Sequence, residues 1–374
     1  MRHQQLWIAV PDKRHYFYQS GRHIADAYFT QGTQFQFILE SGSLLQLAAG
    51  DLNGDGKADL VAAWEVGVGT QEQPIQILVN NPNGAFTDGS SLVVGSLPTV
   101  AHPQQIVLNY FQQNGRLDIL VADHGYDATP FPGHQQKLME WGSDGKLHDV
   151  SATALPQENT FTHRVAVGDV NGDGSLDIIY ANLPGPNGTP LPQLLANNGI
   201  GSFALDQAAL PNSVTGQGTF GNTGALLADL NGDGRTDLVL GGWDPIHTGM
   251  HTSMLYLNNG SGSFSQTAIT LPAPKIPLVD GIGPVALDIR SADLTADGRP
   301  DLLIDWTNGN YTSHYYQILI NQGNAQFADE TQQRLPQTIQ QDYWTVHIYL
   351  ADLAGNGVFD LVTQPITNAP QPFI

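Results

Sequence analysis

The stretch DLNGDGKAD at residues 51–59 returns as DVNGDGSLD at 169–177 and as DLNGDGRTD at 229–237. Weaker copies read DLTADGRPD at 293–301 and DLAGNGVFD at 352–360. A sixth copy, YFQQNGRLD at 110–118, keeps only the Asn-Gly turn and the final Asp. The copies begin at residues 51, 110, 169, 229, 293 and 352, so a unit of about 60 residues repeats along the chain. A repeat array of this kind overrides the expectation of several unrelated domains from chain length alone.

The same short strands are expected around each copy of the loop. An alternating segment precedes the loop, such as RVAVG at 164–168, and an apolar strand follows it, such as DIIYAN at 177–182. A third strand ends at an Asn/Gly turn, such as QLLANNGIG at 193–201. A fourth strand is expected to begin at Phe86, Leu147, Phe203, Phe264 and Phe327. Four short strands joined by Gly- and Asn-containing turns are typical of a propeller blade.

We therefore predict an all-β chain that forms a single β-propeller domain over residues 1–374. Its repeat units are expected to start near residues 44, 103, 162, 222, 286 and 345. The segment 27–40 matches a third and fourth strand, and the segment 346–362 matches a first and second strand. Residues 1–40 and 345–374 are thus expected to share the closing blade, with N- and C-terminal strands paired. This gives six four-stranded blades, or seven if residues 1–23 contain a degenerate piece.

Composition narrows the function classes. A formal net charge of −21 disfavours nucleic acid as a partner, because no basic patch is available to neutralise phosphates. The absence of cysteine excludes disulfides, thiolate zinc sites and cysteine nucleophiles. No apolar run is long enough for membrane insertion. The N-terminal segment lacks the apolar stretch of a signal peptide, so we expect a cytoplasmic protein, or an extracellular or periplasmic one if a leader has been removed. The oligomeric state is left open.

The repeated loop is predicted to bind calcium. Positions 1, 3, 5 and 9 supply carboxylate or amide oxygens and position 7 supplies a backbone carbonyl, which suits a cation that accepts six to eight oxygens. An EF-hand is excluded because its position 12 must be acidic, whereas Ala62, Tyr180 and Leu240 stand there. The expected ligands of the three full copies are Asp51, Asn53, Asp55, Lys57 and Asp59; Asp169, Asn171, Asp173, Ser175 and Asp177; and Asp229, Asn231, Asp233, Arg235 and Asp237.

Two further copies supply fewer oxygens. Thr295 and Ala354 each replace the Asn of position 3, so these loops are either weaker calcium sites or only Asx-rich turns. Their expected ligands are Asp293, Asp297, Arg299 and Asp301, and Asp352, Asn356 and Asp360. The copy at 110–118 has lost the acid of position 1 and is expected to be empty. We thus expect three calcium sites, and up to five.

These units resemble the FG-GAP/VCBS repeat family, which is related to the calcium-binding propellers of integrin α-subunits. The resemblance covers essentially the whole chain. It implies a propeller fold and calcium at the loops that begin at Asp51, Asp169 and Asp229. It does not fix the function, because the family includes adhesion modules, lectins, and lyase or dehydratase propellers.

Histidine and aromatic residues gather in the loops at the strand ends opposite the calcium loops, which we call the second face. Loops of this kind on a rigid scaffold are where binding and catalysis concentrate, although a single loop histidine is more often structural. The histidines His102, His163 and His347 lie in or beside these second-face loops. The ligand-binding candidates are His124, Tyr126, His134, Trp243, His247, His251, Trp306, His314 and Trp344.

A second candidate site follows from the first strands, which ring the central channel of a propeller. The residue five positions before each loop is polar except at Gly224. At the channel mouth this pattern predicts a cluster that could perform acid–base chemistry, or simply form an ion-paired, water-filled channel. Its catalytic candidates are Arg164, Asp288, His347, Tyr349 and His163, with Arg290 nearby.

Three functions remain open from sequence. The first is a binding module for carbohydrate or another small polar molecule. The second is an enzyme of the lyase, dehydratase or cyclase type with one site at the channel mouth. The third is a scaffold for protein interaction. The second-face loops differ strongly between repeats, as DATPFPGHQ at 127–135 and DPIHTGMHT at 244–252 show. That divergence favours one asymmetric site over several equivalent ones.

Overall fold

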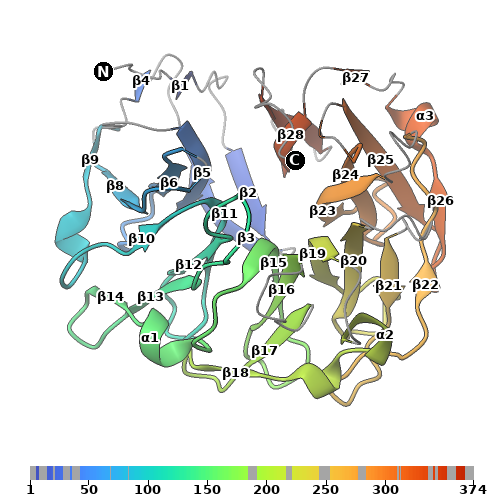
Figure 1. Cartoon of the computed structure of the whole chain (residues 1–374), viewed down its shortest axis with the longest axis horizontal. Helices are drawn as coiled ribbons and strands as arrows, with labels where there is room; N and C mark the ends of the chain where they lie inside the picture. The colour runs from blue at the N-terminus through green and yellow to red at the C-terminus, as the bar shows by residue number, and fades with distance from the viewer. Residues whose placement is uncertain are drawn as a thin grey trace. The chain divides into compact units, whose positions relative to one another are not determined.

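In the computed structural model, strands make up nearly all of the regular secondary structure of the described residues (Figure 1). The described residues are 6–7, 15–19, 22–27, 34–35, 43–67, 69–82, 84–183, 192–215, 221–243, 253–276, 284–309, 311, 313–335, 340–341, 344–351 and 359–366. The helices each have three or four residues: η1 (Ser90–Leu92), α1 (Ser151–Ala154), η2 (Gln207–Ala209), α2 (Asn212–Thr215) and α3 (Thr331–Arg334). None of the helices in these ranges is long and apolar enough to span a membrane.

Five sheets have four strands paired in chain order, which is the arrangement of a propeller blade. Pairing between neighbouring strands is antiparallel, as in β11–β14. The strands of the first two blades are β5 (Ser43–Gly50), β6 (Asp59–Glu65), β8 (Gln76–Asn80) and β9 (Phe86–Asp88), then β11 (Pro103–Asn109), β12 (Asp118–Asp123), β13 (Lys137–Trp141) and β14 (Leu147–Asp149). The all-β prediction of four-stranded blades is thus confirmed.

The next three blades repeat the pattern. Their strands are β15 (Phe161–Gly168), β16 (Asp177–Leu183), β17 (Gln193–Asn197) and β18 (Phe203–Leu205); β19 (Gly221–Ala228), β20 (Asp237–Trp243), β21 (Met254–Tyr256) and β22 (Ile269–Thr270); and β23 (Val285–Ala292), β24 (Asp301–Thr307), β25 (Ser313–Asn321) and β26 (Phe327–Asp329). The fourth strand expected at Phe264 begins instead at Ile269. Phe264 is buried and forms an isolated bridge with Asn258, so it closes the preceding turn rather than opening a strand.

The remaining strands are short or form pairs. β7 (Gln73–Pro74) pairs with β10 (Thr99–Val100), and β27 (Gln340–Gln341) adds to β25. At the two ends of the chain, β1 (Leu6–Trp7) pairs with β4 (Gln34–Phe35), β2 (His15–Gln19) with β3 (Arg22–Ala27), and β28 (Trp344–Ala351) with β29 (Asp360–Ile366). Among these described strands, no pairing joins the N-terminal pairs to β28 or β29. The segment 27–40 thus contributes the end of β3 and the two-residue β4, and ring closure is not confirmed and stays a prediction.

Contacts divide the chain into two compact units, which are described separately below. Unit 1 comprises Met1–Phe161, Asn198–Phe203 and Ala351–Asp360, and unit 2 comprises Thr162–Asn197, Ala204–Leu350 and Leu361–Ile374. The single-domain prediction stays a prediction.

The second strand of each blade lies at the centre of its core. All six residues of β12 and all seven of β24 are buried. In unit 1, Val61 of β6, Val121 of β12 and Met139 of β13 belong to one apolar cluster. Both faces of these strands are covered by apolar side chains, which explains their continuous apolar sequence rather than a period-2 alternation. This rigid centre fixes the two ends of the strand, where the loops carry the functional groups.

Candidate functional site

The three full copies of the predicted calcium loop have one common fold. In the first, a carboxylate oxygen of Asp51 accepts the N–H of Gly54 at 2.7 Å, and its other oxygen accepts the N–H of Gly56 at 2.8 Å. Both glycines have a φ near +80°, which a residue with a side chain rarely adopts. Asp169 and Asp229 make the equivalent pairs of hydrogen bonds. The backbone therefore holds the position-1 carboxylate in place, and the oxygens of positions 1, 3 and 5 on one short loop fit a hard cation such as calcium.

The weaker copies differ in what can be described. Asp293 accepts the N–H groups of Asp297 at 3.1 Å and Gly298 at 2.8 Å, so this loop keeps the fold although Thr295 replaces the Asn. Residues 352–358 lie outside the described part of the chain, and the expected ligands Asp352 and Asn356 fall there.

The Asp at position 9 has a structural role that the sequence did not reveal. In every described copy it is fully buried, one oxygen accepts the N–H of loop position 2, and the other accepts an N–H at the end of the third strand. The carboxylate thus ties the loop to the blade. The pairs of N–H donors are Leu52 and Asn80 for Asp59, Phe111 and Trp141 for Asp118, Val170 and Asn197 for Asp177, Leu230 and Asn258 for Asp237, and Leu294 and Asn321 for Asp301.

The degenerate copy keeps this tie without a calcium ligand at position 1. Elsewhere the Asn that ends the third strand also donates its side-chain N–H to the carbonyl of position 8, as Asn197 does to Leu176 at 3.1 Å. In the degenerate copy Trp141 replaces that Asn, and its indole N–H donates to the Leu117 carbonyl at 2.9 Å. The guanidinium of Arg116 lies 3.7 Å from the Trp141 ring centre. The blade therefore preserves its hydrogen bonds although the metal-ligand pattern is lost.

A buried carboxyl pair beneath this degenerate loop predicts a pH dependence of stability. Burial raises the pKa of Asp118 to about 7, and burial together with the charge of Asp118 raises the pKa of Glu140 to about 8. Both values exceed the unfolded-state pKa of roughly 4, so the stabilisation by these groups is complete below about pH 4 and is lost as pH rises through 7 to 8. With saturating calcium, the Glu140→Gln variant should exceed the parent in free energy of unfolding by about 2–4 kcal/mol at about pH 9, and match it at about pH 4.5.

The control for that experiment is Glu158→Gln, which changes an exposed carboxylate of the same unit. Its unfolding free energy should follow the parent at every pH in urea melts. A Glu140→Gln curve that runs parallel to the parent from acid to base would show that Glu140 does not carry this penalty.

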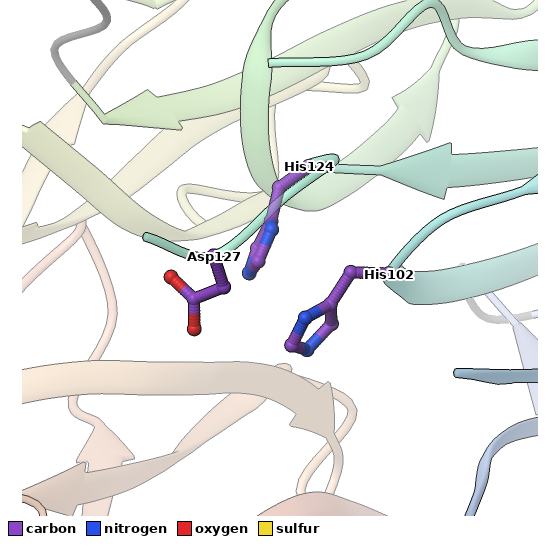
Figure 2. Close-up of side chains that lie close together, drawn as sticks. All are labelled: His102, His124 and Asp127. Carbon is purple, nitrogen blue, oxygen red and sulfur yellow. The ribbon is translucent and has the colours of Figure 1, made fainter. Parts of the chain in front are cut away.

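The second face of unit 1 holds a cluster of two histidines and two carboxylates. β6 begins at the calcium loop with Asp59 and ends at Glu65, so Glu65 lies at the opposite end of that strand. His102 precedes β11, and His124 and Asp127 follow β12. Donor atoms of His102, His124 and Asp127 lie within 4.8 Å of one another, and Figure 2 shows the side chain of His124 between those of Asp127 and His102. Nδ1 of His102 lies 3.0 Å from Oε2 of Glu65.

Asp123, the last residue of β12, fixes the segments that carry these histidines. Its fully buried carboxylate accepts the N–H groups of Ala101 at 2.7 Å, His102 at 2.8 Å and Gly125 at 2.9 Å. His134 adds a side-chain hydrogen bond at 2.8 Å. Burial alone would raise the pKa of Asp123, but the hydrogen bond and charge of His134 and the backbone donors outweigh it and hold that pKa at about 2. An ionised Asp123 thus holds the loops before β11 and after β12 together.

The two cluster histidines pack ring against ring. Their ring centres are 4.2 Å apart, and the ring of His124 stacks on Phe161 at 4.3 Å. Burial lowers the pKa of both imidazoles, and their mutual repulsion lowers that of His102 further. Burial raises the pKa of Glu65 to about 7, helped by the charge of Asp127. The site therefore presents imidazole and carboxyl groups that can accept hydrogen bonds or bind a cation.

Comparison with known proteins decides the family. A model described as FG-GAP-like repeat matches residues 51–121, 111–180, 229–304 and 293–363, which together exceed half of the chain. The chain belongs to the FG-GAP-like repeat family. Mouse cartilage acidic protein 1 is 32% identical over 143 residues, which is 36% of this chain and 20% of that relative. The chain therefore spans a fifth of the length of this curated relative.

Two lectins are among the solved structures similar to this FG-GAP-like repeat chain. An Agrocybe aegerita lectin that recognises non-reducing terminal N-acetylglucosamine is 18% identical, with a TM-score of 0.42, over 87% of this chain and 72% of that one. The fucose-specific lectin of Aleuria aurantia is 13% identical, with a TM-score of 0.41, over 89% of this chain and 98% of that one.

The structure brings together only some of the ligand-binding candidates in the FG-GAP-like repeats. His124 lies in the second-face cluster and His134 beside it, with Tyr126 half-buried in the same loop. Trp306 instead lies wholly inside the core of its blade, where its indole N–H donates to Gln317 at 3.0 Å. His314 is buried in β25 against Tyr316. Only the backbone is described at Trp243 and Trp344, and His247 and His251 lie outside the described residues.

The carboxylates in the second-face cluster and beside it were missed by sequence reasoning. Glu65, Asp123 and Asp127 end strands or begin loops, where acidic residues are common for reasons of turn geometry. The available signal was DHGYD at 123–127, which places two acids around a histidine directly after an apolar strand. Their convergence with His102 depends on the packing of two adjacent blades, which one repeat unit does not encode.

The channel-mouth candidates lie in unit 2. Asp288 is buried and accepts a hydrogen bond from Arg290 at 2.9 Å. Arg164 is also buried and donates to the carbonyl of His163 at 2.8 Å. Burial lowers the pKa of the Arg164 guanidinium, against the opposing charges of Asp288 and Asp305. Tyr349 is exposed, and only the backbone of His347 is described. Three candidates, Arg164, Asp288 and Tyr349, thus share one electrostatic environment, and Asp305 is a member that the sequence did not single out.

Proposed function

We propose that this chain is a calcium-stabilised FG-GAP-like propeller that binds a neutral polar ligand, of the carbohydrate class, on the second face of unit 1. The carrying observation is the convergence of Glu65, His102, His124 and Asp127 beside the partly exposed rings of Tyr126 and Phe131. The imidazole rings and the carboxylates can each accept hydrogen bonds from sugar hydroxyls. Aromatic rings provide the apolar surface that ligand sites combine with a few placed polar groups.

The asymmetry of the blades supports one site rather than several. The residue six positions after the position-9 Asp is Glu65 in the first blade and His124 in the second. In the later blades it is Leu183, Trp243 and Thr307. At this position, titratable side chains therefore occur on the first two blades, both in unit 1. The net charge of −21 further favours a neutral or cationic ligand over an anionic one.

A glycan array followed by calorimetry, with the full chain in calcium, tests this proposal. Asp127→Asn should weaken binding of a positive glycan about 10- to 100-fold, because a hydrogen bond to a charged group contributes about 1.5–3 kcal/mol. His148→Gln is the matched control, since His148 pairs with Asp144 elsewhere on unit 1 and should leave affinity unchanged. An array without binding, or equal affinities of the parent and Asp127→Asn, would refute it.

The enzyme alternative rests on the Arg164–Asp288 cluster. A buried carboxylate that accepts a hydrogen bond from one guanidinium group, interacts electrostatically with a second and lies near an exposed tyrosine is suited to lyase, dehydratase or cyclase chemistry. Any turnover found in a substrate screen should fall at least about 100-fold when Arg164→Lys, Asp288→Asn and His347→Gln are combined. Unchanged turnover in that triple variant would remove the channel mouth as the catalytic site.

A further inference from the structure

We propose that His102, His124 and Asp127 bind one transition-metal dication of the zinc class, with Glu65 as an adjoining carboxylate. This inference goes beyond the proposed function, because the metal would bind whether or not the site also takes a carbohydrate. Among the described residues, these three form the group of His and acidic side chains whose donor atoms gather within 4.8 Å.

The donor set differs in kind from that of the calcium loops. Calcium takes oxygen ligands, whereas two imidazoles and a carboxylate suit zinc, cobalt, nickel or ferrous iron. Three protein ligands leave a fourth position for water or for an oxygen of a bound ligand, as in open zinc sites. Bonds to zinc are about 2.0–2.1 Å long, so the three side chains would close together by about 1 Å on loading.

The hydrogen bond from the His124 ring to the backbone sets its tautomer. Its Nδ1 lies 3.0 Å from the carbonyl oxygen of Gly125, so the ring donates from Nδ1 and Nε2 keeps its lone pair. A histidine that binds a metal usually donates its other ring N–H to a carbonyl or carboxylate in this way. His124 is therefore held in the tautomer that a metal requires.

Glu65 serves the site in either tautomer of His102. The contact between His102 Nδ1 and Glu65 Oε2 is 3.0 Å long but lacks the angles of a hydrogen bond, and both atoms are buried without another partner among the described residues. If Nε2 of His102 binds the metal, the carboxylate charge of Glu65 lies 3.0 Å from Nδ1, which then carries the ring proton. If Nδ1 binds it, Glu65 is placed as a fourth ligand. Two carboxylates and two neutral imidazoles balance a divalent charge.

The backbone around the site is fixed before any metal arrives. Asp123 holds the segments of both histidines by their N–H groups, as described above. Gly125 has a φ of +77°, and a Cβ there would meet the Gly133 carbonyl oxygen at 2.6 Å, so the loop from His124 to Asp127 follows a path that requires glycine. A ligand set on such a constrained loop loses little conformational entropy on binding.

Titration of the full chain with Co²⁺ and Zn²⁺ tests the proposal. The chain is first stripped of metals with EDTA, freed of the chelator and then saturated with calcium. We expect one equivalent of Co²⁺ with the visible absorption of a four- or five-coordinate nitrogen and oxygen site, displaced by one equivalent of Zn²⁺. His124→Asn and Asp127→Asn should lower the affinity at least about 100-fold, and Glu65→Gln about 10- to 100-fold. His148→Gln should bind as the parent does, because the His148–Asp144 pair offers only two donors.

The parent chain alone decides the existence of the site. No Co²⁺ absorption and no stoichiometric Zn²⁺ binding by the parent would overturn the proposal without reliance on any variant. Metal binding that persists in Asp127→Asn and is lost in His148→Gln would also overturn it, since the ion would then lie at the His148–Asp144 pair. The thermal melt of each variant in calcium shows whether it has kept the parent's fold.

Discussion

Replacing Asp118 by Ala should lower the free energy of unfolding by about 3–5 kcal/mol, equally with and without calcium. The buried carboxylate of Asp118 accepts the N–H groups of Phe111 at 3.0 Å and Trp141 at 3.3 Å, and contacts Gln112 N at 3.3 Å. Removing it leaves these backbone donors in an apolar interior, at about 1–3 kcal/mol for each unsatisfied group. Urea unfolding of the parent and the variant measures the loss.

The matched control for this variant is Asp144→Ala, which removes an exposed carboxylate of the same blade. Its unfolding free energy should change by less than about 0.5 kcal/mol. Asp118→Asn keeps one acceptor oxygen and should lose about half as much as Asp118→Ala. Two results would show that the position-9 Asp does not tie the loop to the blade: a free energy of unfolding for Asp118→Ala within about 1 kcal/mol of the parent's, or a difference that is seen only when calcium is present.

Removing calcium is expected to have the largest effect on thermal stability. Binding to the folded state alone adds about 2.7 kcal/mol per site at a hundredfold excess over Kd, so three full loops together contribute about 8 kcal/mol. EGTA should therefore lower the Tm by about 10 °C or more. Calorimetric melts of the chain in calcium and after thorough chelation measure the shift.

Single-loop variants separate the contributions of the three sites. Asp51→Asn, Asp169→Asn and Asp229→Asn should each remove about a third of the EGTA-sensitive shift, because the loops lie in different blades. Asp118→Ala should keep the whole shift, since its loop lacks the position-1 acid. A Tm that is unchanged by EGTA would refute calcium as a structural ion of this chain.

Most of the fold follows from local sequence. The loop at 51–59 and its copies mark the boundaries of the repeat units. The apolar runs between them are long enough only for strands, so a single repeat predicts four strands per unit. The exception at Phe264 has a local reason, because a buried Phe can close a turn as well as open a strand. Pairing at the chain ends depends on contacts between distant segments, which the repeat pattern does not specify.

The candidate sites follow only partly from sequence. The enrichment of histidine in the second-face loops predicted His124 and His134. The acids beside them, Asp123 and Glu65, could not be predicted, because they come together only through the packing of β11 and β12 against β6. Trp306 was wrongly predicted to be a loop aromatic, because β24 continues through Trp306 to Thr307 and all of its residues are buried. The pattern of the first strands predicts that Arg164 and Asp288 lie near one another, because an alternating strand indicates which face each residue occupies, and the two do interact electrostatically. Their catalytic role stays a prediction.

The central claim is that calcium binds at the repeated loops and a zinc-class ion binds at the second face of unit 1. Anomalous diffraction from crystals grown with calcium and zinc tests this claim most directly. Data collected on both sides of the zinc absorption edge should show a zinc peak between His102, His124 and Asp127. Calcium density should appear at the loops that begin at Asp51, Asp169 and Asp229, without a zinc signal there. Zinc found only at the calcium loops, or absent from the second face of unit 1, would contradict this assignment.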